Sequence, residues 1–122
     1  MTAVEDAPKR LELRQLRRPK GQRWLCGPVP MPWLRQARKL SYPTLWTGLI
    51  LWHLAGLKKR ASFPFSNLEA ALWGINRQTK YKTLAALEEA GLIDVKREGH
   101  RAPIVTLLEA KPGEDDDFLA WL

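Results

Sequence analysis

The sequence predicts a mainly helical domain that ends in a β-hairpin, and three observations lead to this fold class. Apolar residues recur at helical spacing in several stretches between residues 31 and 90. After residue 91 the period changes to the alternation that is typical of strands. The 122 residues, 45% of them hydrophobic, are enough for one compact domain plus tails. We expect a basic arm over residues 1–30, a folded domain over 31–110 and an acidic tail over 111–122.

Positive charge is unevenly spread along the chain. The formal net charge of +7 favours an anionic partner such as nucleic acid. Residues 1–30 hold seven Lys/Arg and three acids, and residues 31–60 hold six Lys/Arg and no acid. Residues 61–110 balance at six and six, and residues 111–122 hold one lysine and four acids. The excess cations therefore lie in the N-terminal half.

Several classes of protein are disfavoured by what the sequence contains. Cys26 is the single cysteine, and with two histidines it cannot form a standard structural zinc site. The apolar run over residues 45–57 is shorter than the roughly 18–20 residues that span a bilayer. Neither a Gly-rich phosphate loop nor a nucleophile elbow is present. We expect a cytoplasmic, nucleoid-associated protein that is not an enzyme, has no cofactor and does not contact a membrane.

The first elements are a basic arm and a short helix. We interpret residues 1–30, which combine prolines with arginines and lysines, as an arm that a partner orders, with a plain solvated tail as the alternative. A helix is predicted over residues 31–40, with Pro32 in its first turn. Its outward residues are expected to be Arg35, Arg38 and Lys39, and its inward residues Trp33, Leu34, Ala37 and Leu40.

The second predicted helix begins near Pro43 and is apolar on nearly every face. Such a helix is either central in a core or shared with another chain, so a homodimer through residues 43–59 is one hypothesis. His53 lies in this run, and we expect a satisfied core or edge histidine rather than a ligand or base. Three cations at the helix end suit the helix dipole: Lys58, Lys59 and Arg60.

A short edge strand and a two-turn helix are predicted next. Pro64 removes a ladder donor, which suits an edge strand within residues 61–65. Ser66 and Glu69 have the spacing of a capping box, and Gly74 is suited to stop the helix in the left-handed conformation. We expect an apolar stripe on this helix made of Leu68, Ala71 and Leu72.

A longer helix follows almost at once, from the N-cap Asn76 to about residue 90, where Gly91 stops it. At 100° per residue, Leu84 and Leu87 define its buried side, with Lys80 between them. The outward positions are Arg77, Gln78, Tyr81, Lys82 and Ala85.

The domain ends in a hairpin. Ile93 and Val95 alternate with charged residues, "EGHR" is a polar turn, and Val105 and Leu107 share one face of the return strand. A short helix, a tight turn, a second helix and a hairpin with a basic tip together predict a winged helix-turn-helix, mainly α with a β-hairpin wing.

The segment "NRQTKYKTLAALEEAGLIDVKREGHRAPIVTL", residues 76–107, resembles the recognition helix and wing of bacterial winged-helix regulators of the multiple-antibiotic-resistance regulator (MarR) type. The similarity is closest in "LEEAGLI" at residues 87–93 and covers roughly residues 41–108. In that family the outward residues at the start of the recognition helix read base edges in the major groove. The chain departs from the family at Lys80, where an aliphatic residue is usual.

The resemblance implies a set of DNA contacts. Arginine can pair with guanine and glutamine with adenine, each with roughly 1–3 kcal/mol of discrimination. The implied base contacts are Arg77, Gln78, Tyr81 and Lys82, and the implied wing contacts are Lys96, Arg97, His100 and Arg101. Phosphate contacts are expected from Lys80, Arg35, Arg38, Lys39, Lys58, Lys59 and Arg60.

The leading functional hypothesis is a sequence-specific double-stranded DNA-binding protein that regulates transcription in a bacterium or mobile element. One alternative is a replication or partition accessory of a mobile element with the same fold. Another is a protein–protein adaptor that binds no DNA. The acidic segment over residues 114–122 ends in Phe118, Leu119, Trp121 and Leu122 and is a candidate docking segment for a protein partner. The alternatives are a segment that folds back on the chain's own basic face and an unstructured acidic end.

Overall fold

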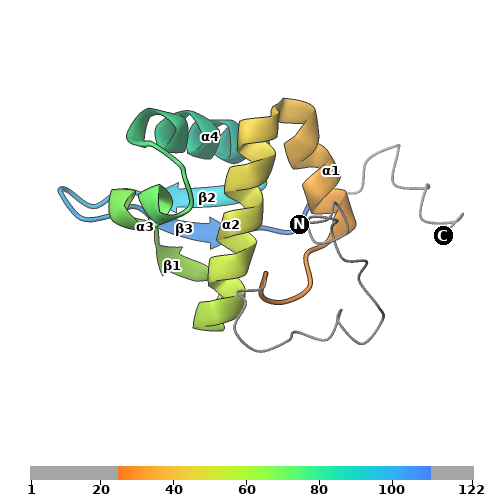
Figure 1. The fold of residues 1–122 in the computed structure, drawn as a ribbon, viewed down its shortest axis with the longest axis horizontal. Helices are drawn as coiled ribbons and strands as arrows, with labels where there is room; N and C mark the ends of the chain where they lie inside the picture. The colour runs from red at the N-terminus through yellow and green to blue at the C-terminus, as the bar shows by residue number, and fades with distance from the viewer. Residues whose placement is uncertain (1–24, 111–122) are drawn as a thin grey trace, which may run out of the picture.

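The structure is a computed structural model that describes residues 25–110. This part of the chain is mainly helical, with a small antiparallel sheet, and is compatible with a winged helix-like arrangement (Figure 1). In chain order the elements are α1 (Met31–Leu40), α2 (Tyr42–Lys58), β1 (Ser62–Pro64), α3 (Asn67–Leu72), α4 (Arg77–Glu89), β2 (Ile93–Lys96) and β3 (Ile104–Leu107). The predicted tail and all but the last residues of the predicted arm lie outside the described residues.

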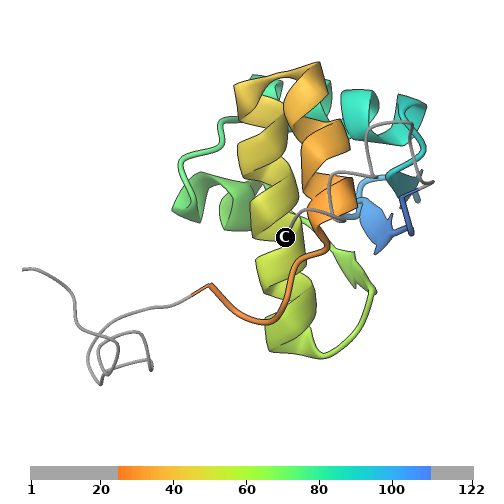
Figure 2. The same cartoon turned by 90° about the vertical axis from the view of Figure 1, so that its right-hand side faces the viewer.

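Helices α1 and α2 lie side by side and antiparallel in both views (Figures 1 and 2). Trp33 of α1 is fully buried at their contact, and its Nε1 donates to the carbonyl oxygen of Leu92 at 3.1 Å. The indole ring fits over Gly48 of α2, where an added Cβ would lie 2.5 Å from a ring carbon. The two helices therefore approach closely because a glycine stands opposite the tryptophan.

Replacing Gly48 by alanine should lower the free energy of unfolding by up to about 2 kcal/mol. Overpacking against the fixed Trp33 ring costs about 1–3 kcal/mol, whereas alanine in a helix interior regains about 1 kcal/mol over glycine. Urea denaturation of the wild type and G48A measures the difference. In a W33L background the same change should cost less, because the smaller side chain leaves room; an equal cost in both backgrounds contradicts this explanation.

Helix α2 lies at the centre of the core, which explains why its sequence is apolar on nearly every face. It contacts α1, α4 and β1, and Ile50, Leu51 and Leu54 are among its buried side chains. His53 is buried too, and its Nδ1 accepts from the backbone N–H of Cys26 at 2.8 Å. The expectation of a satisfied core histidine is confirmed. The homodimer through residues 43–59 remains a prediction, and among residues 25–110 no helix has the length and apolar character to cross a membrane.

The sheet has the strand order β1-β3-β2, with both neighbouring pairs antiparallel. Val105 of β3 pairs with Phe63 on one side and Val95 on the other. Phe63 and Val105 are buried and Val95 packs against the core, so this row of side chains faces the helices. The predicted edge strand is confirmed: Pro64 lies on an outer strand, where a missing N–H breaks no second ladder.

Local capping follows the sequence closely around α3 and α4. The side chain of Ser66 accepts from the backbone N–H of Glu69, and that of Asn76 accepts from the backbone N–H of Thr79. Gly74 and Gly91 both have φ of +77°, in the left-handed region that only glycine adopts at low cost. The predicted boundaries of both helices are therefore confirmed.

The predicted apolar stripe of α3 faces solvent, and one predicted inward-facing residue of α1 is exposed. Leu68 and Leu72 of α3 are 74% and 76% exposed, Ala71 is exposed, and Ala70 is the buried residue of this helix. Leu40 at the end of α1 is 42% exposed. In both cases a helical stripe was chosen from spacing alone, whereas the face that is buried depends on how a short helix lies against its neighbours.

Candidate nucleic-acid interface

The candidate reading surface is the outward face of α4. Thr83, Leu84 and Leu87 bury one side of this helix against the core, which turns the opposite side to solvent. Tyr81 remains 41% exposed, and the guanidinium carbon of Arg77 lies 5.8 Å from the centroid of its ring. All the predicted outward residues are exposed: Arg77, Gln78, Tyr81, Lys82 and Ala85.

The turn between β2 and β3 is the second part of the candidate interface. It is built around Gly99, with φ of +58°, and a hydrogen bond of 3.2 Å from the N–H of Arg101 to the carbonyl oxygen of Glu98. Figure 1 shows this turn and the N-terminal end of α4 projecting toward the same side of the molecule. The basic residues of this turn and its flank are all exposed: Lys96, Arg97, His100 and Arg101.

Lys80 does not belong to the exposed surface, so its proposed phosphate contact is inconsistent with the structure. Its side chain is 1% exposed, and Nζ donates to Oδ1 of Asn67 in α3 at 2.9 Å. Nζ also lies 5.5 Å from the ring centroid of Phe65 and 5.6 Å from that of Tyr81. Helical spacing places position 80 on the buried side of α4, and the lysine occupies it by directing its ammonium into the junction between α3 and α4.

The surroundings lower the pKa of the Lys80 ammonium below its ordinary value of 10.5. Burial is the main cause, and the positive charges of Arg97 and Arg77 add to it, whereas Glu69 acts in the opposite direction. Arg97 belongs to the hairpin turn and Arg77 to the first turn of α4, so their influence on one ammonium agrees with the two parts of the interface being close together.

The lowered pKa of Lys80 predicts a pH dependence of stability. Between the folded-state pKa and 10.5 the unfolded chain binds more protons, so the free energy of unfolding should rise with pH in this window. Below the window the lysine is charged in both states and the full cost of burying it applies. Because other groups titrate as well, the measurement is the wild-type value minus that of K80M, by urea denaturation from pH 7 upward. A difference that stays constant or falls contradicts the prediction.

The remaining candidate phosphate contacts separate into two exposed groups and one half-buried pair. Arg38 and Lys39 are exposed at the end of α1, close to the beginning of α2 and therefore to α4. Lys59 and Arg60 are exposed beyond the other end of α2, which is about 25 Å long at 1.5 Å per residue over 17 residues. In the half-buried pair, Lys58 is 3.4 Å from the Glu69 carboxylate and Arg35 has an interaction partner, as does the exposed Lys39.

A shallow groove of about 390 Å³ lies between α4 and the turn that follows Arg38 and Lys39 in the chain. It lies between the turn that joins α1 to α2 and residues 79–86 of α4. Its lining residues include Ser41 and Thr44 on one side and Thr79 and Lys82 on the other. The polar hydroxyls and the single lysine make this groove a continuation of the outward face of α4 toward Arg38 and Lys39.

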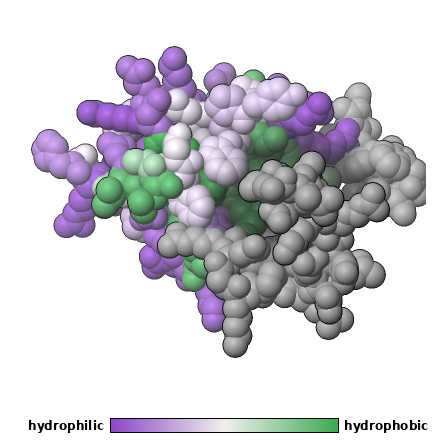
Figure 3. Space-filling model, viewed as in Figure 1, coloured by the Kyte–Doolittle hydropathy of each residue, from purple (hydrophilic) through white to green (hydrophobic). Residues whose placement is uncertain are grey.

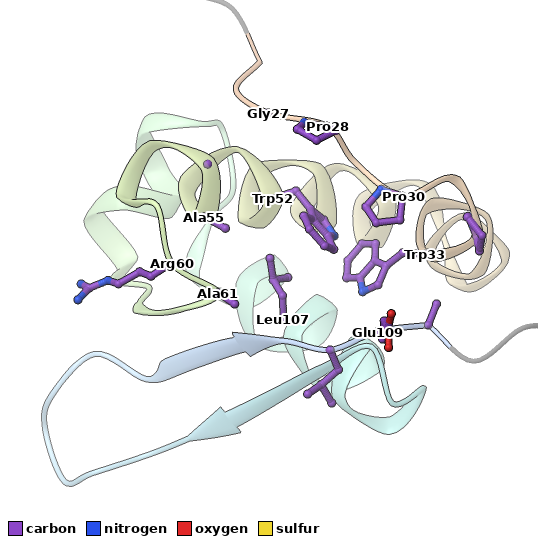
Figure 4. Close-up of a pocket in the computed structure, with 14 residues that line it drawn as sticks. Gly27, Pro28, Pro30, Trp33, Trp52, Ala55, Arg60, Ala61, Leu107 and Glu109 are labelled. Carbon is purple, nitrogen blue, oxygen red and sulfur yellow. The ribbon is translucent and has the colours of Figure 1, made fainter.

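Two apolar surface features lie elsewhere. The exposed Leu68 and Leu72 form a hydrophobic patch at the position of α3 (Figure 3). A groove of about 680 Å³ lies between α2, the segment before α1 and the end of β3, with Trp33 and Trp52 at its centre (Figure 4). Arg60 and Glu109 lie near its opposite ends. The groove was not predicted from the sequence, because its lining residues are distant along the chain. The stripe of Leu68 and Leu72 was predicted, but not that it faces solvent.

Sequence reasoning also missed Asn67. It is exposed at the first position of α3, and nothing in its local sequence indicates a partner in another helix. Comparison of the chain with protein-family models, with curated proteins and with solved structures found no match. The arrangement of the residues themselves is therefore the basis for assigning a function.

Proposed function

We propose that the protein is a sequence-specific double-stranded DNA-binding protein with a winged helix-turn-helix fold, which acts as a transcriptional regulator. In this proposal α3 and α4 form the helix-turn-helix, α4 enters the major groove and the β2–β3 turn is the wing. The order of α2, β1, α3, α4 and the hairpin supports it, as does the resemblance of residues 76–107 to MarR-type regulators. The observation that carries the proposal is the exposed N-terminal half of α4 beside a basic hairpin turn on the same side of the molecule.

Affinity and specificity would come from different residues. Arg77 and Gln78 have the donor and acceptor geometry to discriminate guanine and adenine in the major groove. The outward face of α4 alone carries too few charges to account for strong binding. Arg38, Lys39 and the basic hairpin turn would hold phosphates on either side of it, which is the usual division between positioning contacts and base contacts.

The direct test is selection of duplexes from a random-sequence library by the full chain, followed by binding titrations. We expect one enriched motif, with an affinity at least a hundredfold above that for poly(dI-dC) and a steep fall in both affinities with salt. Binding that is salt-sensitive but equal for all sequences would contradict the recognition function. A replication or partition accessory would give the same in vitro result and would differ in the genomic position of the enriched motif.

A second candidate function is a protein–protein adaptor, and the exposed leucines of α3 are the observation that favours it. Leu68 and Leu72 stand next to one another on the helix, and Trp46 nearby donates from Nε1 to the carbonyl oxygen of Trp73 at 2.9 Å. Large exposed apolar side chains gathered together usually mark a contact surface. Under this function the chain has no salt-sensitive affinity for DNA, and the change L68S/L72S abolishes co-purification of a partner without altering the fold.

A further inference from the structure

We propose that Lys80 is a positioning residue for DNA recognition: its buried ammonium joins α3 to α4 and sets the orientation of Tyr81 on the outward face of α4. This inference rests on the proposed DNA-binding function and deepens it. It concerns a residue that touches no surface where DNA would lie, since Lys80 is 1% exposed and its Nζ donates to Oδ1 of Asn67 at 2.9 Å.

Helix α3 has little apolar contact to hold it in place. It has two turns, only Ala70 is buried, and its two leucines point to solvent. Polar contacts to its neighbours therefore carry much of its positioning. Glu69 is 3.4 Å from Lys58 of α2, and Asn67 accepts from Lys80 of α4. Of these two links, the one from Lys80 joins α3 directly to α4.

The same ammonium also contacts Tyr81, which lies on the outward face of α4. The ring of Tyr81 has the Lys80 Nζ at 5.6 Å from its centroid and the Arg77 guanidinium carbon at 5.8 Å. Contacts between cations and aromatic rings favour particular ring orientations, by about 0.5–1 kcal/mol at exposed sites and more where the cation is desolvated. Asn67 and Phe65 hold the ammonium in place. Its contact with the ring of Tyr81 therefore restrains the orientation of that ring.

Stability alone does not explain a lysine at this position. A buried charge is costly, and replacing it with an apolar side chain of similar size is often neutral or stabilising. Methionine would fill the same volume, and Asn67 is exposed and would hydrogen-bond to water instead. A lysine that makes one defined hydrogen bond between two helices favours a single geometry of their crossing, which is what base recognition requires.

The test compares two affinities for each variant: one for the duplex that the wild-type chain enriches from a random library, and one for poly(dI-dC). The readout is their ratio. K80M should be as stable as the wild type or more stable at pH 7, and its ratio should fall about tenfold, the value of one good base contact. N67A should lower the ratio similarly. N67D, which keeps the acceptor, should preserve the ratio within about twofold.

K39M is the matched control, because it removes one exposed lysine charge from the end of α1. It should weaken binding to both duplexes alike and leave the ratio unchanged. A K80M ratio within twofold of the wild-type ratio overturns the inference while the proposed function stands. A wild-type chain that enriches no sequence overturns the proposed function and this inference with it.

Discussion

Replacing Trp33 by alanine should lower the free energy of unfolding by about 3–5 kcal/mol, the usual cost of truncating a fully buried tryptophan. The ring packs against Gly48, which has no side chain that could fill the space left by its removal. The ring also meets Trp52 edge-on, with centroids 5.7 Å apart. The carbonyl oxygen of Leu92 would lose the indole N–H but keep the N–H of Leu108 at 3.0 Å. The loss is therefore mainly one of packing.

Such a loss is large for a domain of this size, because typical stabilities are about 5–15 kcal/mol. Thermal or urea denaturation followed by far-UV circular dichroism measures it. W46A is the matched control, since Trp46 is 47% exposed and makes one hydrogen bond, to the carbonyl oxygen of Trp73. We expect W46A to cost about 1 kcal/mol. If W33A costs no more than W46A, the α1–α2 contact is not the centre of the core.

The triple change R77A/Q78A/K82A should lower the affinity for the selected duplex by roughly thirtyfold or more. Two lost base contacts of roughly 1–3 kcal/mol each account for this factor, and one phosphate or base contact of Lys82 adds to it. All three side chains are exposed, and alanine is the best helix former, so stability should change little. Gel-shift or fluorescence-anisotropy titrations at a fixed salt concentration measure the affinity.

The double change R38A/K39A provides the comparison, because it also removes one arginine and one lysine. These residues lie at the end of α1, where phosphate contacts are proposed. The double variant should weaken binding to all sequences to a similar degree and reduce the salt dependence. Unchanged binding of the selected duplex by the triple variant would contradict the assignment of α4 as the recognition helix.

Much of the fold could be predicted because its signals are local. Asn76 caps α4 and Gly91 stops it through groups within a few residues along the chain, and spacing alone identified Leu84 and Leu87 as its buried side. The outward residues of α4 followed from the same geometry. Their role in binding DNA is a proposal that depends on the resemblance and on the arrangement of the surface.

The features that could not be predicted from the sequence depend on contacts with elements that are distant along the chain. A two-turn helix has too few residues for spacing to choose its buried face, so the predicted stripe of Leu68, Ala71 and Leu72 did not show that Ala70 is the buried residue. The partner of Lys80 could not be found from sequence, because Asn67 lies 13 residues away in another helix. The cations of the N-terminal half were treated as one group, but the length of α2 separates Arg38 and Lys39 from Lys59 and Arg60.

The sequence by itself determined the order, type and boundaries of the elements, since caps, glycine stops and hydrophobic periods act over a few residues. Only the tertiary structure decided which face α3 turns to solvent, where the Lys80 ammonium points and which cations lie near α4. These depend on contacts between Trp33 and Gly48, Lys80 and Asn67, and Lys58 and Glu69, which join separate elements. Such contacts form only once the helices have packed, and a linear sequence does not specify which side chains then meet.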